Sequence, residues 1–309
     1  MRCDRLTITD NVGTEYSLSE LGAKRVFTSQ SGFGMPNINR LTETGPFQHG
    51  ATNLGFRLQP RVVQISFVMV SDHSTERFFS GRDKLFNTIF VPTNTPLKLK
   101  YYYSDGSDVV RQLDCYYNGG LSGDFDKFEN SPSIPMVVEL LAIDPAWYDP
   151  ELKTKTYITT DVVGDSLVFP FSFGDDEDNI VFAETSIASS TVLTYNGSWI
   201  EYPTITITGP ITNPTVWNIS TSEKISIEYE LGSGEYVIID LTYGNKSVVN
   251  GAGTNLIGTV TSDSDLATFH LAPSPEVTDG ENTIEVSGAG IVAGESSIDI
   301  EYYERYLGV

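Results

Sequence analysis

In Val63-Gln64-Ile65-Ser66-Phe67-Val68-Met69, apolar side chains occupy every second position. Successive side chains of a β-strand point to opposite faces of the sheet, so this alternation gives one wholly apolar face and one partly polar face. The stretch therefore predicts a half-buried strand that covers a hydrophobic core.

The residues that follow continue this strand pattern, with one interruption. Further strands are expected at 97–103, 109–117 and 136–143. Between the first two, Asp105-Gly106 favours a hairpin turn, because both residue types tolerate positive φ. The interruption is the segment 74–90, where the spacing of apolar residues is helical. The N-terminal half is therefore expected to be a sheet with one helix.

The helical segment 74–90 has recognisable ends and one apolar face. Ser74 is a plausible N-cap, and Pro92 lies just beyond the last helical residue. Its aromatic stripe could form a partner surface, but packing on the core is the usual role of such a face. We expect core packing for the apolar residues Phe78, Phe79, Leu85, Phe86, Ile89 and Phe90.

The chain changes character after Tyr148-Asp149-Pro150. Residues 1–150 hold 14 Lys+Arg against 17 Asp+Glu (14 − 17 = −3), and residues 151–309 hold 5 against 24 (5 − 24 = −19). We place a domain boundary there, giving domains 1–150 and 151–309. Short strand-like runs separated by turn clusters such as 232–234 and 251–253 fill the second part. Strands are expected at 167–173, 204–208, 224–230, 236–242, 267–271, 283–286 and 297–303.

The expected fold class is therefore mainly β. The N-terminal domain is interpreted as a β-sandwich or split-barrel-like domain with one α-helix, and the C-terminal domain as an antiparallel β-sandwich.

Charge and cysteine content exclude several classes of function. A net charge of −22 disfavours binding to nucleic acid and to anionic membrane surfaces. Cys3 and Cys115 are far apart, so neither a disulfide framework nor a zinc site is indicated. The start resembles no secretory signal, and no apolar run reaches the roughly 20 residues that span a bilayer. We expect a protein without membrane insertion.

Three features of the sequence are candidates for ligand sites. The acidic run 175–179 could gather oxygen ligands around calcium, although an exposed turn is the simpler interpretation. The glycine-rich stretch 288–294 precedes no helix, so it indicates a strand connection and not a phosphate loop. His49, His73 and His270 are dispersed and have no metal-ligand spacing. His270 could contact a sugar or peptide, but a partly exposed strand histidine is the simpler expectation. No catalytic, cofactor-binding or metal-binding residue is predicted.

The junction of the two parts carries a recognisable motif. Residues 140–149 run from an apolar strand into Asp144-Pro145-Ala146-Trp147-Tyr148, where Pro145 halts the strand and the two aromatics can wedge the junction. This motif resembles the distal tail proteins of long-tailed, siphovirus-type bacteriophages. Stretches 203–214, 234–240 and 280–284 are similar to that family's galectin-like or carbohydrate-module-like domain. The segment 272–279 departs from the family pattern as an apparent insertion.

The resemblance implies a structural protein of the virion that is assembled in the bacterial cytoplasm and located at the tail tip or baseplate. It implies a ring, a homohexamer in that family, that surrounds the DNA channel and joins the tail-tube protein to the tail-tip hub protein. Receptor-binding or side-fibre proteins are further implied partners, and no cofactor is implied. For contacts between copies, we expect the segment 27–59, which lacks obvious regular structure, and the hairpin at Asp105-Gly106.

Two other functions remain open from the residues. A carbohydrate-binding adhesion module would need an exposed aromatic platform, for which Trp199, Trp217 and Tyr243 are candidates, although core packing is the usual place for tryptophan. A glycan-cleaving enzyme would need two carboxylates in one cleft. No sequence signature of nucleophilic, zinc or phosphoryl chemistry is present, so we expect no enzyme.

Overall fold

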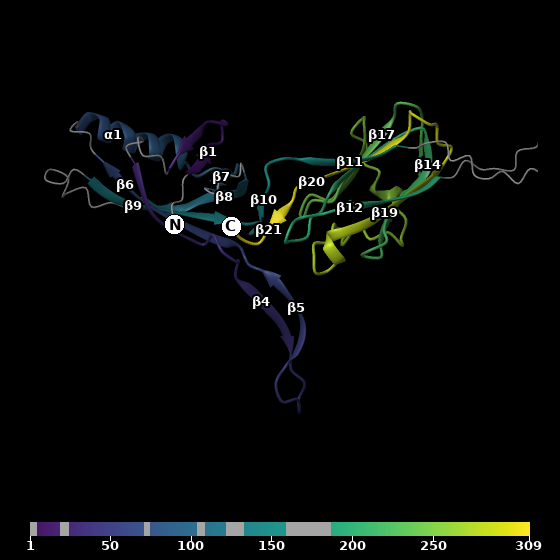
Figure 1. Ribbon diagram of the computed structural model, residues 1–309, viewed down its shortest axis with the longest axis horizontal. Helices are drawn as coiled ribbons and strands as arrows, with labels where there is room; N and C mark the ends of the chain where they lie inside the picture. The colour runs from purple at the N-terminus through teal and green to yellow at the C-terminus, as the bar shows by residue number, and fades with distance from the viewer. Residues whose placement is uncertain (1–4, 19–24, 71–74, 104–108, 122–132, 159–186) are drawn as a thin grey trace, which may run out of the picture. The chain divides into compact units, whose positions relative to one another are not determined.

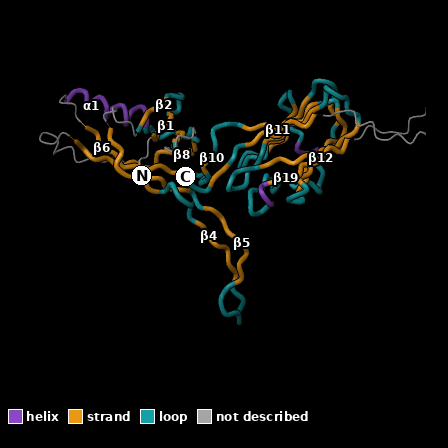
Figure 2. Tube along the Cα trace, viewed as in Figure 1, coloured by secondary structure: helices purple, strands orange, loops and turns teal. Residues whose placement is uncertain are grey.

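The computed structural model describes residues 5–18, 25–70, 75–103, 109–121, 133–158 and 187–309 (Figures 1 and 2). The chain forms two compact units. The first comprises Met1–Pro150 with Arg305–Val309, and the second comprises Glu151–Glu304. Within the described ranges, no helix is long and apolar enough to cross a membrane. The expected turn at Asp105-Gly106 and the expected N-cap Ser74 lie outside the described residues.

The first unit is built on one antiparallel sheet with the strand order β2-β1-β7-β8-β9-β6-β3, and β10 and β21 pair at its side. Its strands are β1 (Arg5–Thr9), β2 (Glu15–Ser17), β3 (Arg25–Ser31), β6 (Arg61–Val70), β7 (Leu97–Tyr102), β8 (Val110–Gly120), β9 (Ser133–Ala142), β10 (Trp147–Tyr148) and β21 (Arg305–Tyr306). The strands expected at 63–69, 97–103, 109–117 and 136–143 are confirmed.

Strand β8 joins the two halves of this sheet. Its residues up to Cys115 pair with β7, and those from Tyr116 onward pair with β9, with an irregularity before Gly119. Gly120 has φ of 97°, and a Cβ there would lie 2.3 Å from the Val137 carbonyl oxygen. Only glycine fits this bend without strain. The bend lets side chains from both halves share one core.

That core confirms the alternation in β6. Val63, Ile65, Phe67 and Met69 are at most 3% exposed, whereas the intervening residues are only partly buried or exposed. They form one cluster with apolar residues of β1, β7, β8 and β9. Burying an apolar side chain of this size contributes roughly 1.5–3 kcal/mol, so this strand is a major source of the unit's stability.

The expected helix is present but is not one regular α-helix. Helix α1 (Thr75–Lys84) continues as a π-helical turn over Leu85–Ile89, in which the Phe90 N–H donates to the Leu85 carbonyl at 2.9 Å. The wider turn lets Leu85, Ile89 and Phe90 all reach the core, where each is at most 2% exposed. The apolar face therefore packs on the sheet, as expected. Phe79 and Phe86 are partly buried and pack against the same core.

The segment 27–59, expected to be irregular, is largely β-structure, so that expectation is wrong. After β3, the chain forms the hairpin of β4 (Ile38–Glu43) and β5 (Thr52–Leu58), which pair with each other as a separate two-stranded sheet. Figure 1 shows this hairpin extending away from the larger sheet. The sequence pattern hid it because both faces of the hairpin are largely exposed, so apolar residues do not alternate.

The second unit contains two antiparallel sheets, with the orders β11-β20-β13-β17-β18 and β12-β19-β14-β15, and β16 beside β14. Apolar side chains of both sheets share one core. The mainly β fold class with one helix is thus confirmed. The strands are β11 (Lys153–Ile158), β12 (Ile187–Thr194), β13 (Thr204–Thr208), β14 (Ile211–Asn218), β15 (Glu223–Ser226), β16 (Glu230–Leu231), β17 (Tyr236–Asp240), β18 (Ser247–Asn250), β19 (Glu281–Ala289) and β20 (Ser297–Tyr302).

One strand expectation in this unit is wrong. Residues 267–271 form a turn in which the N–H groups of Thr268 and Phe269 donate to the Asp265 carbonyl, and only Leu271 makes an isolated bridge, to Glu201. Phe269 and Leu271 are both fully buried, which produces the alternation of a strand without its ladder. The expected strand at 167–173 lies outside the described residues.

Arg61 ties distant parts of the first unit together. Its Nε–H donates to the Pro145 carbonyl at 2.8 Å, and Nη1 donates to the carbonyls of Gly32, at 2.7 Å, and Gly34. Nη2 donates to the Leu307 carbonyl at 2.7 Å. The residue is 3% exposed. Burial lowers the pKa of Arg61 to about 10, so the guanidinium still carries its charge at neutral pH.

The contact with Leu307 belongs to a return of the chain end. Strand β21 pairs with β10, and the Val309 N–H donates to the Phe33 carbonyl at 3.2 Å. Residues 305–309 therefore belong to the first unit, whereas the boundary predicted from the sequence places all of 151–309 in the second domain.

We predict that Arg61→Met destabilises the first unit by about 3 kcal/mol, because buried carbonyls lose their charged donor. The chain end should loosen with it. Hydrogen exchange followed by mass spectrometry should show faster exchange in residues 305–309 and around Phe33. The matched control is Arg57→Met, which removes an exposed arginine from β5. Equal protection of the chain end in both variants would contradict the role assigned to Arg61.

A second prediction concerns Asp10, which closes the turn between β1 and β2. Its Oδ1 accepts from the N–H groups of Val12 at 3.0 Å and Thr14 at 2.8 Å, and its Oδ2 accepts from the Tyr16 hydroxyl at 3.1 Å. Burial alone would raise the pKa of Asp10, but these hydrogen bonds outweigh it and hold the pKa below the ordinary 3.8. The stabilisation is therefore present above pH 3.8 and is lost as the pH falls through the lower folded-state pKa.

Accordingly, Asp10→Ala should lower the free energy of unfolding at pH 7 by about 1–2 kcal/mol. The difference from the wild type should shrink in strong acid, where the wild-type carboxylate is protonated. Thermal unfolding at pH 7 and in strong acid measures both values, with Asp83→Ala, at an exposed position on α1, as control. A difference independent of pH would show that the carboxylate charge is not responsible.

Candidate functional site

The hairpin of β4 and β5 presents an unusual concentration of exposed apolar side chains. We call residues 38–58 the apolar arm. Within it, Phe47 is 99% exposed and Leu54 61%. Ile38 and Phe56 are each more than 40% exposed, and the Arg40 guanidinium lies over the Phe56 ring at 5.6 Å. None of these residues, all of which the structure describes, belongs to the core of the first unit.

The arm has an ordered tip and a fixed root. At the tip, Gln48 accepts from the Gly45 N–H at 3.1 Å and donates to the Thr52 hydroxyl at 2.9 Å. At the root, Gly32 has φ of 82°, and a Cβ there would lie 2.1 Å from the Val62 carbonyl oxygen. The root is the segment whose carbonyls bind Arg61. The hairpin is therefore held at a defined exit point while its apolar residues face solvent.

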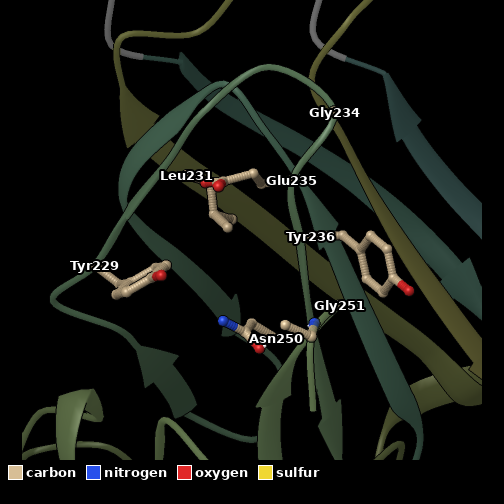
Figure 3. Close-up of a pocket in the computed structure, with 8 residues that line it drawn as sticks. Tyr229, Leu231, Gly234, Glu235, Tyr236, Asn250 and Gly251 are labelled. Atoms are coloured by element: carbon tan, nitrogen blue, oxygen red, sulfur yellow. Dashed lines mark hydrogen bonds between the residues drawn. The ribbon is translucent and has the colours of Figure 1, made fainter. Parts of the chain in front are cut away.

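A second candidate site is a cleft in the second unit with a volume of about 330 Å³. It lies where the turn between β16 and β17 approaches the turn after β18. In Figure 3, Tyr229 and Tyr236 stand on opposite sides, with Asn250 between them. The lining residues are Tyr229, Leu231, Gly234, Glu235, Tyr236, Asn250, Gly251 and Ala252.

The polar residues of the cleft are fixed by hydrogen bonds to the turns. Glu235 Oε2 accepts from the Gly232 N–H at 2.9 Å. Asn250 Oδ1 accepts from the N–H groups of Ala252 at 3.1 Å and Thr254 at 2.9 Å. The cleft can therefore offer polar groups in set positions to a small ligand. In the sequence, the glycine clusters 232–234 and 251–253 indicate only separators between strands, and no local pattern shows that they form the two rims of the cleft.

The three histidines do not come together in a site. His49 is exposed in the turn of the apolar arm, His270 belongs to the second unit, and His73 lies outside the described residues. The His270 ring is held by carboxylates, with Nδ1 at 2.9 Å from Glu223 and Nε2 at 3.2 Å from Glu276. Among the residues that the structure describes, no group of His, Cys, Asp and Glu could hold a metal ion. The acidic run 175–179 lies outside them.

The candidate platform aromatics are not core residues. Tyr243 is 82% exposed and Trp217 is 41% exposed, and Trp199 is partly buried. Trp217 lies on β14, whereas Tyr243 follows β17 in the other sheet, next to Tyr202 at a ring separation of 6.5 Å. The core packing expected for Trp217 is therefore wrong, because it occupies an outward-facing position of its strand.

Comparison with known proteins finds one family model and several solved structures that match this chain. Residues 196–306 match the family model of the siphovirus-type tail component, C-terminal domain. Among solved structures, the SPP1 Dit protein matches with a TM-score of 0.60 and 14% identity, over 97% of this chain and 98% of that one. Two structures of the phage P2 baseplate in its activated conformation, with Ca and with Sr, match with TM-scores of 0.47 and 0.46 and identities of 10% and 9%. Each covers 96% of this chain and 97% of the other. No curated protein matches the chain.

The likeness to the SPP1 protein extends the shared fold over both units, and the family match identifies the second part of the chain independently of it. Both agree with the resemblance found at the junction motif. Residues 196–306 are thus similar to the C-terminal domain of siphovirus-type tail components, and the whole chain shares its fold with the SPP1 Dit protein.

Proposed function

We propose that this chain forms the hub ring of the phage tail. Copies of the first unit associate side by side around a DNA channel, and the ring joins the tail-tube protein to the tail-tip or baseplate proteins. The SPP1 protein of the same fold is described as a paradigm of the hub adsorption apparatus in phages that infect Gram-positive bacteria. The family match supports the same structural role and no enzymatic one.

The observation that carries the proposal is the apolar arm. A two-stranded hairpin alone is at best marginally stable in water, and this one exposes Phe47 and Leu54 at its far end. Exposed apolar side chains gathered on one projecting element mark an interaction surface. The arm therefore fits a protein partner that covers it in the assembled tail.

Charge favours a second copy of this chain as that partner. The apolar arm carries Arg40 and Arg57 against Glu43, a net charge of 2 − 1 = +1, in a chain with a net charge of −22. The arm is thus attracted to the surface of another copy, while the rest of that copy is repelled. An arm on one flank and a receiving surface on another are unlike faces, and such a heterologous contact closes into a ring when the rotation fits.

The uneven charge of the two domains supports the same arrangement. Residues 1–150 have a net charge of only −3, whereas residues 151–309 have a net charge of −19. Copies of the first part can therefore pack closely. Six such acidic domains, as in a homohexamer, would repel one another and would remain dispersed around the ring. They would be available to carry receptor-binding or side-fibre proteins.

We predict that Phe47→Ser combined with Leu54→Ser weakens self-association at least about thirtyfold, because buried anchors at an interface typically contribute 2 kcal/mol or more. Light scattering and native mass spectrometry of the full chain, alone and with its tail-tube protein, measure the oligomer. Negative-stain microscopy should show wild-type rings with an open centre.

The control is Val12→Ser, which removes an apolar side chain that is 89% exposed in the β1–β2 turn of the same unit. This variant should assemble like the wild type. A wild-type chain that stays monomeric even with tail-tube protein would refute the ring. Rings of undiminished stability in the double variant would refute the role of the apolar arm.

A further inference from the structure

We propose that the cleft between Tyr229 and Tyr236 in the second unit binds a neutral saccharide. The hub ring does not require such a site, so this inference goes beyond the proposed function. It rests on the polar groups that the turns leave pointing at the cleft, on its aromatic walls and on its charge.

Glu235 supplies a hydrogen-bond acceptor. One carboxylate oxygen, Oε2, is engaged with the Gly232 N–H. The other oxygen, Oε1, has no hydrogen-bond partner among the described residues. A carboxylate held by one oxygen keeps its orientation and can accept hydrogen bonds from hydroxyl groups with the other.

Asn250, another lining residue, supplies two donors. Its Oδ1 accepts from two backbone N–H groups in the following turn, which fixes the plane of the amide. No described residue accepts from its Nδ2. The cleft thus holds a fixed acceptor and a fixed pair of donors, and an array of adjacent hydroxyls, each both donor and acceptor, can satisfy both.

Two tyrosines are among the lining residues of the cleft. Tyr236 is 39% exposed, and its ring packs over Gly251, where an added Cβ would lie 2.8 Å from the ring. Tyr229 stands on the opposite side and packs against the core of the unit. Flat aromatic surfaces suit the apolar C–H faces of a sugar ring, and tyrosine adds a polar end.

The charge and size of the cleft limit the chemical class and the size of the ligand. Its lining contains one carboxylate and no Lys, Arg or His, so an anionic sugar or phosphate would be repelled. A purely apolar ligand would bury Glu235 and Asn250 without hydrogen-bond partners, which is unfavourable. The volume of about 330 Å³ is at the small end of ligand pockets, which fits one or two sugar rings.

The experiment is saturation-transfer difference NMR and titration of the full chain with glucose, galactose, N-acetylglucosamine and lactose, with sialic acid and glucose 6-phosphate as anionic probes. At least one neutral sugar should bind, with a Kd near the millimolar range that corresponds to about −4 kcal/mol. The anionic probes should bind at least tenfold more weakly.

Two variants test the site without removing the turns. Asn250→Asp keeps the acceptor for the Ala252 and Thr254 N–H groups but removes the donors, and Glu235→Gln keeps the bond to Gly232 but removes the charge. Each should weaken binding at least tenfold at unchanged thermal stability. Tyr243→Ala, at a tyrosine that is 82% exposed elsewhere in the unit, should bind like the wild type.

Three results would overturn the inference. In the first, no neutral sugar binds even at sugar concentrations about tenfold above the millimolar range. In the second, only the anionic probes bind, and in the third, both cleft variants bind neutral sugar like the wild type. Loss of binding in Tyr243→Ala alone would place the sugar on that exposed ring and would also overturn it. Ring assembly is measured separately, so failure of sugar binding leaves the hub proposal standing.

Discussion

The first unit depends on a buried cation whose hydrogen-bond acceptors among the described residues are all backbone carbonyls. Arg61 lies at the start of β6, and its guanidinium joins the root of the apolar arm, the chain at Pro145 and the returning C-terminus. A buried charge is costly unless its donors are bonded, so these segments cannot separate without leaving donors and carbonyls unpaired. Arginine suits this position better than lysine because its planar fork serves several acceptors at once.

This constraint explains how an otherwise unsupported hairpin can have a defined origin. The apolar arm contributes nothing to the core that it leaves, and its root is held by the Gly32 carbonyl and by the close approach of Gly32 to Val62. A projecting element with a rigid root loses less conformational freedom on docking than a loose loop does. In the proposed ring, a fixed root would let the exposed apolar hairpin make a specific contact.

The sequence predicts those parts of the fold in which burial alternates regularly. Val63–Met69 and Thr204–Thr208 were found because each has one face in a core. The sequence pattern does not predict the apolar arm, because neither face of this hairpin is buried within its own unit. Residues 267–271 show the alternation of a strand because a turn buries alternate side chains there. The return of residues 305–309 follows from long-range bonds to Arg61 and Phe33, which no local pattern encodes.

The cleft could not be found from sequence for a different reason. Asn250 and Glu235 look like ordinary turn residues, and each does hold a turn with one oxygen. Turn chemistry uses only half of an amide or a carboxylate, so the other half is left to face whatever the fold places opposite. Here the fold places two tyrosines and no cation there. A negatively charged ligand would therefore meet a carboxylate and no compensating cation at this cleft.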